Sequence, residues 1–430
     1  MNYVDLSDST RARQYVEMLR EASTLSEPSE VQKIFARMLR DDRTVQGFVS
    51  VSTRGLPDGQ YKITRSNLDD DLGVVNVNPW QQWGQFPTHS GGFIGEVIRT
   101  PEPKIIHNMS VRNDPVLGDK LARFGSCFVN PLFDDGKAIN WSITLRLDPV
   151  GYRPEEAENI ILRGNIIGRM TKNLVVAKQV IELNRKLTQQ LEQVALIQRS
   201  LLPDHTPDFP GLRIATSYLT SNEAGGDYYD FFEMGKDRLG VMIADVSGHG
   251  AGAATVMAML QTILRGYQER AKGPAAMLEH ANRELTAKRV ESNFVTAFMG
   301  VFDLDRRTLT YSSAGHPPPV RRHVEGGVDL VEGAGSVPLG IIDEAGYGEV
   351  AVPLGRRETL VFYTDGITEA FSPPPSKQMF GVEGIKSALV ECDAEPLCVI
   401  ENIHEHLYDH TNSRDRADDQ TIVAVRVEEG

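Results

Sequence analysis

The chain is poor in the residues and segments that mark secreted, membrane-spanning or disordered proteins. It has three cysteines in 430 residues and no C-x-x-C pair, as expected of cysteines that fill cores in a reduced compartment. The first residues form neither a basic nor an apolar signal region, and no run approaches the ~18 apolar residues of a membrane helix. Internal repeats and low-complexity tracts are also missing. We therefore expect a cytoplasmic protein without membrane insertion.

Positive charge is scarce as well. Lysine and arginine number 45 against 59 aspartates and glutamates, for a net charge of -14. Such a surface repels a phosphate backbone, which argues against nucleic acid as a partner. Hydrophobic residues make up 40% and charged residues 24%, the balance of a globular protein. At ~100 to 200 residues per domain, the length predicts two or three domains.

Changes of pattern divide the chain into four parts. Residues 1–24 carry a helical pattern, and 25–170 add a mixed α/β module whose short β-like runs end in Pro-Asp-Gly, Gly-Gly and Asp-Asp-Gly turns. Residues 171–203 form a helical linker. Residues 204–430 alternate strands and helices, which predicts two sheets with helices outside them. In the first module, Trp80 and Trp83 either line a pocket or simply pack.

The linker helix is expected to begin at Pro154, because proline suits the first helical position and Glu155 and Glu156 suit the positive end of the helix dipole. Apolar residues then recur in steps of 4, 3, 4, 4 and 3 at Val176, Val180, Leu183, Leu187, Leu191 and Val194. This spacing is typical of a coiled-coil seam with one stutter. It favours a homodimer through the helix over a helix packed on its own domain.

Aspartates recur at strand ends in the last 230 residues, often beside glycine. They are Asp227 and Asp230 in E-A-G-G-D-Y-Y-D, Asp245 in I-A-D-V-S-G-H-G, Asp365 in F-Y-T-D-G, and Asp418 and Asp419 in R-A-D-D-Q-T. A single Asp-Gly is usually a turn. Four such stretches after apolar runs instead predict a site for two hard cations, Mg²⁺ or Mn²⁺, which take oxygen ligands and can share a carboxylate.

Two other readings of local motifs are weaker. G-H-G-A-G-A after a strand fits a loose dinucleotide-binding fingerprint, but that fold needs a second strand ending in an acid about 20 residues later, where the chain reads R-G-Y-Q-E-R-A-K-G-P. His404, His406 and His410 suggest zinc, but H-E-x-x-H is missing, and a solvated helix face is the better interpretation.

The ordered motifs of residues 205–428 resemble the metal-dependent protein phosphatases of the bacterial SpoIIE-like branch. They include E-A-G-G-D-Y-Y-D, I-A-D-V-S-G-H-G-A-G-A-A, Y-S-S-A-G-H-P-P-P, L-V-F-Y-T-D-G-I-T-E-A and D-D-Q-T-I-V-A-V-R-V, preceded by L-I-Q-R-S-L-L-P. The resemblance implies an αββα sandwich, a two-metal centre and hydrolysis of phosphoserine or phosphothreonine. It also implies that a phosphorylated anti-sigma-factor antagonist in a partner-switching pathway is the substrate.

Transferred by motif, the resemblance implies that Asp245 bridges the metals and that the Val246 carbonyl adds a ligand. Asp365 and Asp418 would bind one metal, with Asp227 on the other side. No covalent nucleophile is implied, in keeping with the lack of a C-x5-R loop.

The resemblance leaves the roles of several residues undecided. Asp419 could replace Asp418, and Asp230 is the weaker neighbour of Asp227, because a continuing strand would turn it to the other face. Larger relatives have a histidine two residues after the bridging aspartate. Here Ser247 takes that place, and His249 lies further on. No arginine matches the phosphate-clamping arginine of those relatives.

The first module resembles a GAF domain, through G-G-F-I-G-E-V-I-R-T-P-E-P-K-I-I-H-N and F-G-S-C-F-V-N-P-L-F-D-D-G-K-A-I-N-W-S-I-T-L. Such domains bind small molecules or dimerise, and the cyclic-nucleotide signature N-K-x-n-F-x3-D-E is missing. Together the parts predict a sensor-regulated phosphatase. The alternative is a catalytically silent metal-binding scaffold that recruits partners through the same surface.

Overall fold

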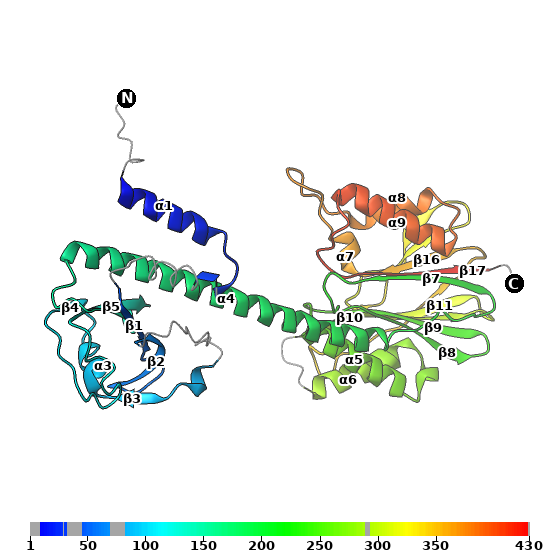
Figure 1. Ribbon diagram of the computed structural model, residues 1–430. Coiled ribbons are helices and arrows are strands. Elements are labelled where there is room, and N and C mark those ends of the chain that lie inside the picture. The colour runs from blue at the N-terminus through cyan, green and yellow to red at the C-terminus, as the bar shows by residue number, and fades with distance from the viewer. Residues whose placement is uncertain (1–8, 29, 32–44, 69–81, 289–292, 429–430) are drawn as a thin grey trace, which may run out of the picture. The chain divides into compact units, whose positions relative to one another are not determined.

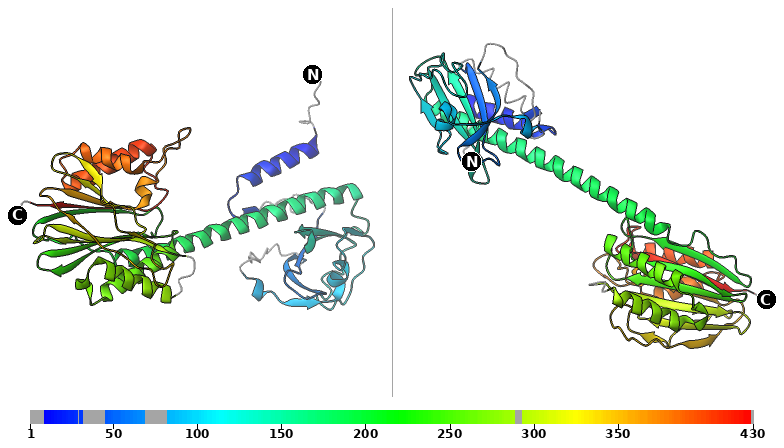
Figure 2. Two further views of the ribbon diagram at one scale, coloured as in Figure 1. Left: turned by 180° about the vertical axis from the view of Figure 1, so that it is seen from behind. Right: turned by 90° about the horizontal axis from the view of Figure 1, so that it is seen from below.

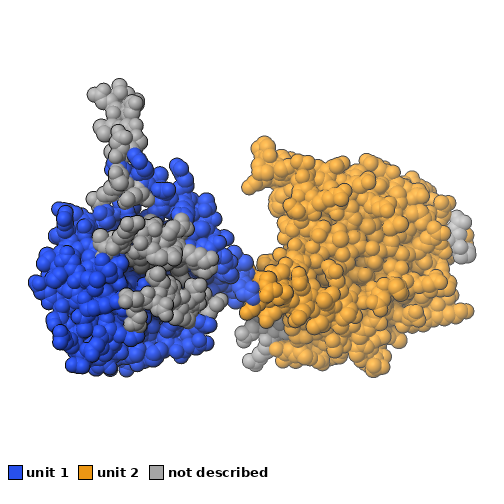
Figure 3. Space-filling view, in the orientation of Figure 1, with its two compact units in different colours: residues 1–183 blue, residues 184–430 orange. Residues whose placement is uncertain are grey.

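The computed structural model describes residues 9–28, 30–31, 45–68, 82–288 and 293–428. The chain divides into two compact units, Met1–Leu183 and Asn184–Gly430 (Figure 3). Trp80 and most of the predicted helical stretch after residue 31 lie outside the described ranges. Within these ranges, no helix has both the length and the apolar character needed to cross a bilayer.

The first unit is built on a six-stranded antiparallel sheet in the order β3-β2-β1-β6-β5-β4. Its elements are α1 (Thr10–Ser23), β1 (Gly47–Ser52), β2 (Gln60–Asn67), β3 (Thr88–Ser90), α3 (Gly92–Val97), β4 (Lys104–Ile106), β5 (Ser126–Asp134) and β6 (Lys137–Arg146). Alternation along the strands gives the sheet two faces. Val49 and Val51 of β1 join one core with Ile143 of β6, whereas Phe128 of β5 packs on the opposite side against Ala157.

Helix α4 (Pro154–Arg199) begins at Pro154, as the sequence predicted, and runs for 46 residues. Its first turns cover the sheet of the first unit. Further along, the apolar side chains of Val176, Val180, Leu183 and Leu187 are between 44% and 68% exposed. Leu191 and Val194 are partly covered. The predicted seam is therefore an apolar stripe that this single chain leaves open to solvent over its first four positions.

The second unit contains two sheets. The first has the order β14-β11-β10-β9-β8, with β15 also paired to β11, and the second has the order β13-β12-β16-β17-β7. The strands are β7 (Leu212–Leu219), β8 (Tyr228–Gly235), β9 (Arg238–Val246), β10 (Val295–Asp303), β11 (Thr308–Ala314), β12 (Val320–Arg322), β13 (Val328–Leu330), β14 (Gly335–Ser336), β15 (Val350–Pro353), β16 (Thr359–Tyr363) and β17 (Gln420–Val427).

Helices cover the outer face of each sheet (Figures 1 and 2). They are α5 (Ala251–Gly266), α6 (Pro274–Ala287), α7 (Asp365–Thr368), α8 (Gly381–Val390) and α9 (Pro396–Thr411). Helices α5 and α6 lie against the first sheet, and α8 and α9 against the second. The layers are therefore helix, sheet, sheet, helix, in agreement with the αββα sandwich that the resemblance implied.

Large aromatic side chains fill the space between the two sheets. Phe298 of β10 and Phe362 of β16 meet with their ring centroids 5.5 Å apart, and both are almost completely buried. Aromatic pairs of this kind add to the free energy that apolar burial supplies. They hold the two sheets face to face, so that strand ends from both sheets meet at one edge.

Helix α5 ends earlier than the sequence predicted. From the sequence alone, the stretch from about residue 251 to about residue 270 is expected to be one helix, but α5 stops at Gly266 and Tyr267 turns to extended backbone, with φ -71° and ψ 119°. A short 3-10 turn, Arg270–Lys272, follows before α6. Glycine is a poor interior helix residue, and this favours the early end.

Candidate metal centre

Five aspartates come together where strands of both sheets begin or end. We call Asp227, Asp245, Asp365, Asp418 and Asp419 the aspartate cluster. Asp245 is the penultimate residue of β9, and Asp227 directly precedes β8. Asp365 follows β16 and opens α7, while the pair Asp418 and Asp419 directly precedes β17. The two sheets thus each contribute carboxylates to one edge of the sandwich.

The pKa of Asp245 shows how close these charges lie. Burial raises the pKa of its carboxyl to about 9, and repulsion from the other four members of the cluster adds to the shift. Burial also raises the pKa of Asp365. Acids concentrated in this way are costly to ionise together unless a cation neutralises them. The cluster therefore has the charge that a divalent metal requires.

Asp227 is only 1% exposed and is held by hydroxyl groups. Its Oδ2 accepts hydrogen bonds from Thr364 Oγ1 at 2.8 Å and from Thr421 Oγ1 at 2.5 Å. Burial nevertheless raises the pKa of Asp227 to about 8. With Oδ2 fixed by two donors, the other oxygen, Oδ1, is the one that can face a cation.

Asp418 and Asp419 are adjacent but differ in environment. Asp419 is buried; its Oδ1 accepts from Ser221 N at 2.7 Å and its Oδ2 from Gly226 N at 2.7 Å. Asp418 is exposed, and its Oδ1 accepts from Asp419 N at 2.8 Å. Both oxygens of Asp419 are thus already used by backbone donors. Asp418 is the more accessible of the two to a cation.

Asp230 lies outside the cluster. It is fully buried and forms a two-point ion pair with Arg265 of α5, with Nε to Oδ2 at 2.7 Å. Tyr228 OH donates to its Oδ2 at 2.6 Å, and Phe231 N donates to its Oδ1 at 2.8 Å. The expectation that Asp227 is the better candidate of this pair agrees with that geometry, because Asp230 is occupied by an arginine.

The loop after Asp245 carries the other sequence candidates. Gly248 and Gly250 have φ of 90° and 78°, values that glycine adopts without strain. His249, between them, is exposed. Ser247 is used structurally, because its Oγ accepts from Phe294 N at 2.9 Å. This geometry gives His249 no fixed position from which to act as an acid.

The backbone carbonyl of Val246 faces Gly226. A Cβ on Gly226 would lie 2.7 Å from Val246 O and 3.4 Å from Asp245 Oδ1. A larger residue would therefore collide with the Val246 carbonyl and would lie in van der Waals contact with the Asp245 carboxylate. Similarly, a Cβ on Gly366 would lie 2.0 Å from Asp419 O and 3.2 Å from the Cβ of Asp418. The glycines let the backbone beside Asp227 and Asp365 approach the other members of the aspartate cluster.

His316, in the Y-S-S-A-G-H motif, is a site residue to which the sequence assigned no role. It is buried between the sheets, with Nδ1 at 3.0 Å from Thr296 Oγ1 of β10 and Nε2 at 3.1 Å from Tyr363 O of β16. Because a carbonyl only accepts, Nε2 carries the proton and Nδ1 accepts from the threonine. Burial lowers the pKa of His316 to about 3, so the ring is neutral.

The hydroxyls of Thr364 and Thr421 also escaped sequence analysis. Both belong to the quoted motifs F-Y-T-D-G and D-D-Q-T, but 57 positions separate them. No local pattern indicates that they meet on one carboxylate. The one feature of the sequence that could have indicated this contact is that each of the two acidic motifs contains a threonine.

The fit of a metal pair can be judged from the donor set. Carboxylate and carbonyl oxygens are the ligands that Mg²⁺ and Mn²⁺ prefer. Two ions ~3.5 to 4 Å apart spread their ligands more widely than a single ion does. The aspartate cluster, with the Val246 carbonyl, fits such a pair by its chemistry and by the glycines that clear its centre.

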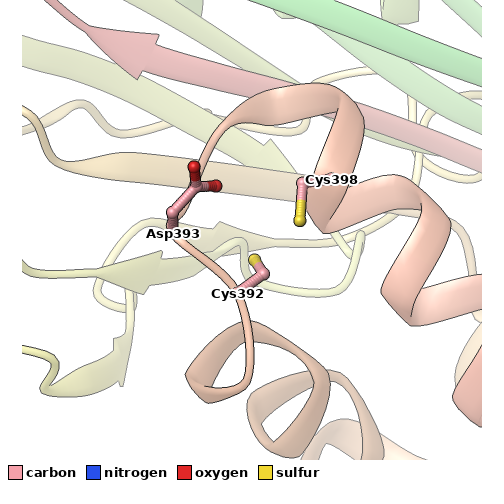
Figure 4. A group of neighbouring side chains, drawn as sticks. All are labelled: Cys392, Asp393 and Cys398. Atoms are coloured by element: carbon pink, nitrogen blue, oxygen red, sulfur yellow. The ribbon is translucent and has the colours of Figure 1, made fainter.

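A tighter group of metal-ligating side chains lies elsewhere in the second unit. Within the described residues, ligand atoms of Cys392, Asp393 and Cys398 all lie within 4.8 Å of one another, at the turn between α8 and α9 (Figure 4). Asp393 Oδ1 accepts from Glu395 N at 3.1 Å, and burial raises the pKa of the Cys392 thiol. A raised pKa disfavours the thiolate that binds metal, so we assign no metal there.

The three C-terminal histidines make separate contacts. His404 Nε2 lies 2.8 Å from Ser217 Oγ, His406 Nε2 lies 3.1 Å from Glu391 Oε2, and His410 Nε2 lies 2.9 Å from Gln378 O. These contacts reach three different segments. The histidines therefore do not form the zinc site that was considered from the sequence.

Comparisons with known proteins agree with this geometry. Residues 235–428 match the family model described as Stage II sporulation protein E (SpoIIE). Protein IcfG of Synechocystis sp. is 26% identical over 263 residues, covering 55% of this chain and 41% of IcfG. Phosphoserine phosphatase RsbU of Bacillus subtilis is 26% identical over 249 residues, covering 57% of this chain and 72% of RsbU. The chain thus spans less than half of the IcfG length.

A solved structure supports the fold. The SiaA-PP2C domain of Pseudomonas aeruginosa is 22% identical, with a TM-score of 0.50, and the match covers 57% of this chain and 99% of that domain. This likeness concerns the arrangement of the sandwich. The family model and the motif order show that residues 235–428 of this chain are similar to the SpoIIE family of PP2C-type serine/threonine phosphatase domains, and the solved structure supports their fold.

Proposed function

We propose that this chain is a sensor-regulated, metal-dependent phosphoserine/phosphothreonine protein phosphatase. The observation that carries the proposal is the convergence of aspartates from both sheets at one edge, where burial and then repulsion among them raise the pKa of Asp245. Such a concentration of acids, most of them buried or partly buried, is unfavourable for folding alone and is explained by cation binding. Two Mn²⁺ or Mg²⁺ ions are the expected cofactors.

We propose a separate role for each residue of the site. Asp245 would bridge the two ions, with the Val246 carbonyl beside it, and Asp365 and Asp418 would hold one ion while Asp227 holds the network on the other side. Bound metals would supply a water of lowered pKa and neutralise phosphoryl charge. The chain's own contribution is orientation: Thr364 and Thr421 fix Asp227, and His316 ties β10 to β16 beneath the acids.

For the substrate, we propose a phosphorylated anti-sigma-factor antagonist in a partner-switching pathway. RsbU, a phosphoserine phosphatase by name, matches more than half of this chain, and so does the phosphoserine phosphatase RsbP of Bacillus subtilis. A protein substrate also agrees with the open edge of the sandwich, where Asp418 is exposed. No tunnel or lid is needed to admit a phosphorylated side chain.

The sensor role belongs to the first unit, which we propose is GAF-like. A cavity of about 350 Å³ lies there between the sheet and α4, and Trp83 and Phe48 line it together with Ser50, Thr64, Arg65 and Lys172. Volumes of ~300 Å³ and above hold small ligands. A small molecule in this cavity would touch the helix that continues along the chain into the second unit, which supports a sensing function.

For assembly, we propose a homodimer through α4. The exposed apolar stripe of Val176, Val180, Leu183 and Leu187 has coiled-coil spacing. A second copy of the same helix offers the matching stripe, and pairing would remove the apolar side chains from water. In a monomer these apolar side chains would remain exposed to water.

The test of the catalytic proposal uses the full chain with Mn²⁺ and p-nitrophenyl phosphate. We expect hydrolysis that Asp245→Ala reduces by about a thousandfold or more, as for loss of a central catalytic group. Asp305→Ala, an exposed acid outside the cluster, serves as the matched control and should retain wild-type activity. A rate that Asp245→Ala leaves unchanged would reject the proposal.

The alternative is a catalytically silent metal-binding scaffold. It predicts Mn²⁺ binding without hydrolysis of either p-nitrophenyl phosphate or any phosphoprotein. A pull-down of phosphoproteins with the full chain, followed by loss of phosphate on adding Mn²⁺, decides between the two and identifies the substrate.

A further inference from the structure

Gln198, in the last turn of α4, makes a two-point contact with the loop that precedes Asp227. Its Nε2 donates to Gly225 O at 2.6 Å, and Gly225 N donates to its Oε1 at 3.1 Å. The side chain is only 3% exposed. A buried amide that pairs with both polar groups of one residue acts like a neighbouring strand and fixes that residue's position.

The loop is held from its other side by the aspartate cluster. Gly226 N donates to Asp419 Oδ2 at 2.7 Å. A Cβ on Gly225 would overlap the same carboxylate, so the backbone passes as close to Asp419 as a glycine allows. The segment Ala224–Gly226, which we call the glycine loop, thus lies between Gln198 and Asp419.

Small side chains bring α4 close to this loop. Ala195 of α4, Ala224 of the glycine loop and Ala254 of α5 form one buried cluster, with Val194 packed against it. Methyl-sized residues allow close approach of backbones. Any displacement of the last turn of α4 therefore reaches both the glycine loop and α5, the helix that follows Asp245 and Val246.

The glycine loop also touches two of the proposed metal ligands directly. Asp227 is its next residue, and Tyr218 OH, which lies 3.3 Å from Gln198 Nε2, donates to the Asp227 carbonyl at 3.3 Å. Val246 N donates to Gly226 O at 3.4 Å. The position of the loop thus sets the positions of Asp227 and of the Val246 backbone.

We propose that Gln198 is a positioning residue that links the last turn of α4 to the affinity of the metal centre. With the amide in place, the glycine loop holds Asp227 and Val246 in the geometry that binds metal. When the last turn of α4 shifts, the two hydrogen bonds break and the site loosens. This rests on the proposed function, and it makes metal affinity the quantity that a signal carried by α4 would change.

The test measures metal binding rather than activity alone. In Gln198→Leu the side chain stays similar in size but loses both hydrogen bonds to Gly225, leaving the Gly225 N–H and C=O unpaired, together with the weaker one from Nε2 to Tyr218 OH. We expect Mn²⁺ binding, measured by calorimetry on the full chain, to weaken by about tenfold. Activity should fall at limiting Mn²⁺ and recover toward wild type at excess Mn²⁺. Gln189→Leu, on the exposed part of the same helix, is the matched control.

A second variant separates positioning from mere support of the fold. Gln198→Glu keeps the acceptor for Gly225 N but sets a second oxygen against Gly225 O in a buried place, so its Mn²⁺ affinity should fall at least as far as that of Gln198→Leu. Should the leucine variant melt at a lower temperature yet bind Mn²⁺ as tightly as wild type, the amide only supports the fold and the inference is wrong.

Failure of the proposed function would look different. In that case the wild-type chain would bind Mn²⁺ without hydrolysing phosphate, while the calorimetric comparison of the Gln198 variants could still be made.

Discussion

At the scale of single residues, neighbouring aspartates with the same chemistry have different roles because their surroundings differ. Asp419 is surrounded by backbone donors and Asp418 is open. Asp230 is paired with Arg265, whereas Asp227 accepts only from hydroxyl groups on its Oδ2. A carboxylate whose oxygens are already satisfied gains little from a metal, which is why the environment separates ligands from structural acids.

This difference predicts opposite effects for two adjacent substitutions. Asp418→Asn should weaken Mn²⁺ binding at least tenfold while the metal-free chain melts as wild type does. Asp419→Asn should cost about 1–3 kcal/mol of stability, since an amide cannot accept from both Ser221 and Gly226. Calorimetric titration and thermal melts of both variants check this. If Asp419→Asn alone abolished metal binding, our assignment of the pair would be reversed.

A second prediction concerns the stability of the metal-free protein. Folding raises the pKa of Asp245 from ~4 to about 9, so the folded state binds this proton more tightly than the unfolded state. Stability therefore falls as pH rises between those values. Asp245→Asn removes the penalty, and we expect its melting temperature at pH 8 to exceed wild type by about 4 °C. The difference should shrink as pH falls toward the unfolded pKa.

The control for that measurement is Asp305→Asn, which removes an exposed charge outside the cluster. It should leave the melting temperature within about 1 °C of wild type at either pH. A destabilised Asp245→Asn protein at pH 8 would contradict the view that the acids repel one another.

At the scale of elements, helix α4 shows what a sequence pattern determines. Its start at Pro154 and the spacing of its apolar residues could be predicted from the sequence, because the helix dipole and hydrophobic periodicity depend on neighbouring residues only. The contact of its last turn with the glycine loop was not readable. That contact joins Gln198 to Gly225 across 27 positions, and no local rule selects such a pair.

The exposed stripe on α4 predicts the effect of charge on assembly. A glutamate at Val180 or Leu187, both at least half exposed in the single chain, would place like charges against each other in a parallel pair. We expect Leu187→Glu to convert the dimer to a monomer in sedimentation analysis, with p-nitrophenyl phosphate hydrolysis at excess Mn²⁺ retained. Gln189→Glu, beside the stripe, should remain dimeric. A wild-type chain that is monomeric at all concentrations would overturn the homodimer proposal.

At the scale of the whole molecule, the alternation of strands and helices in the second unit followed from hydrophobic patterns and turn residues, whereas the short strands β12 to β15 and helix α8 were not predicted. The register that brings Asp245 of one sheet to Asp365 of the other did not follow from these patterns, because it depends on how two sheets pack through residues such as Phe298 and Phe362. Motif order supplied that information indirectly. It identified the acids as one set, while the hydroxyls of Thr364 and Thr421 became visible only in three dimensions.

Division into two units predicts two responses to metal removal. Chelation should lower the melting temperature of the second unit only, since a ligand that binds the folded state stabilises it by mass action. At Mn²⁺ a hundredfold above its dissociation constant, the stabilisation is about 2.7 kcal/mol. Differential scanning calorimetry with and without chelator checks whether one transition moves. A shift of both transitions by the same amount would show that the units do not unfold independently.

The buried imidazole of His316 joins the two sheets through Thr296, the strand partner of Asp245, and through Tyr363, two residues before Asp365, yet it brings no charge with it. A lysine or arginine in that place would act as a built-in counterion and compete with any incoming cation. Because the two hydrogen bonds of His316 are made by a neutral ring, they leave the negative potential of the aspartate cluster unchanged. The two sheets are therefore held together without placing a positive charge that would compete with a cation at the aspartate cluster.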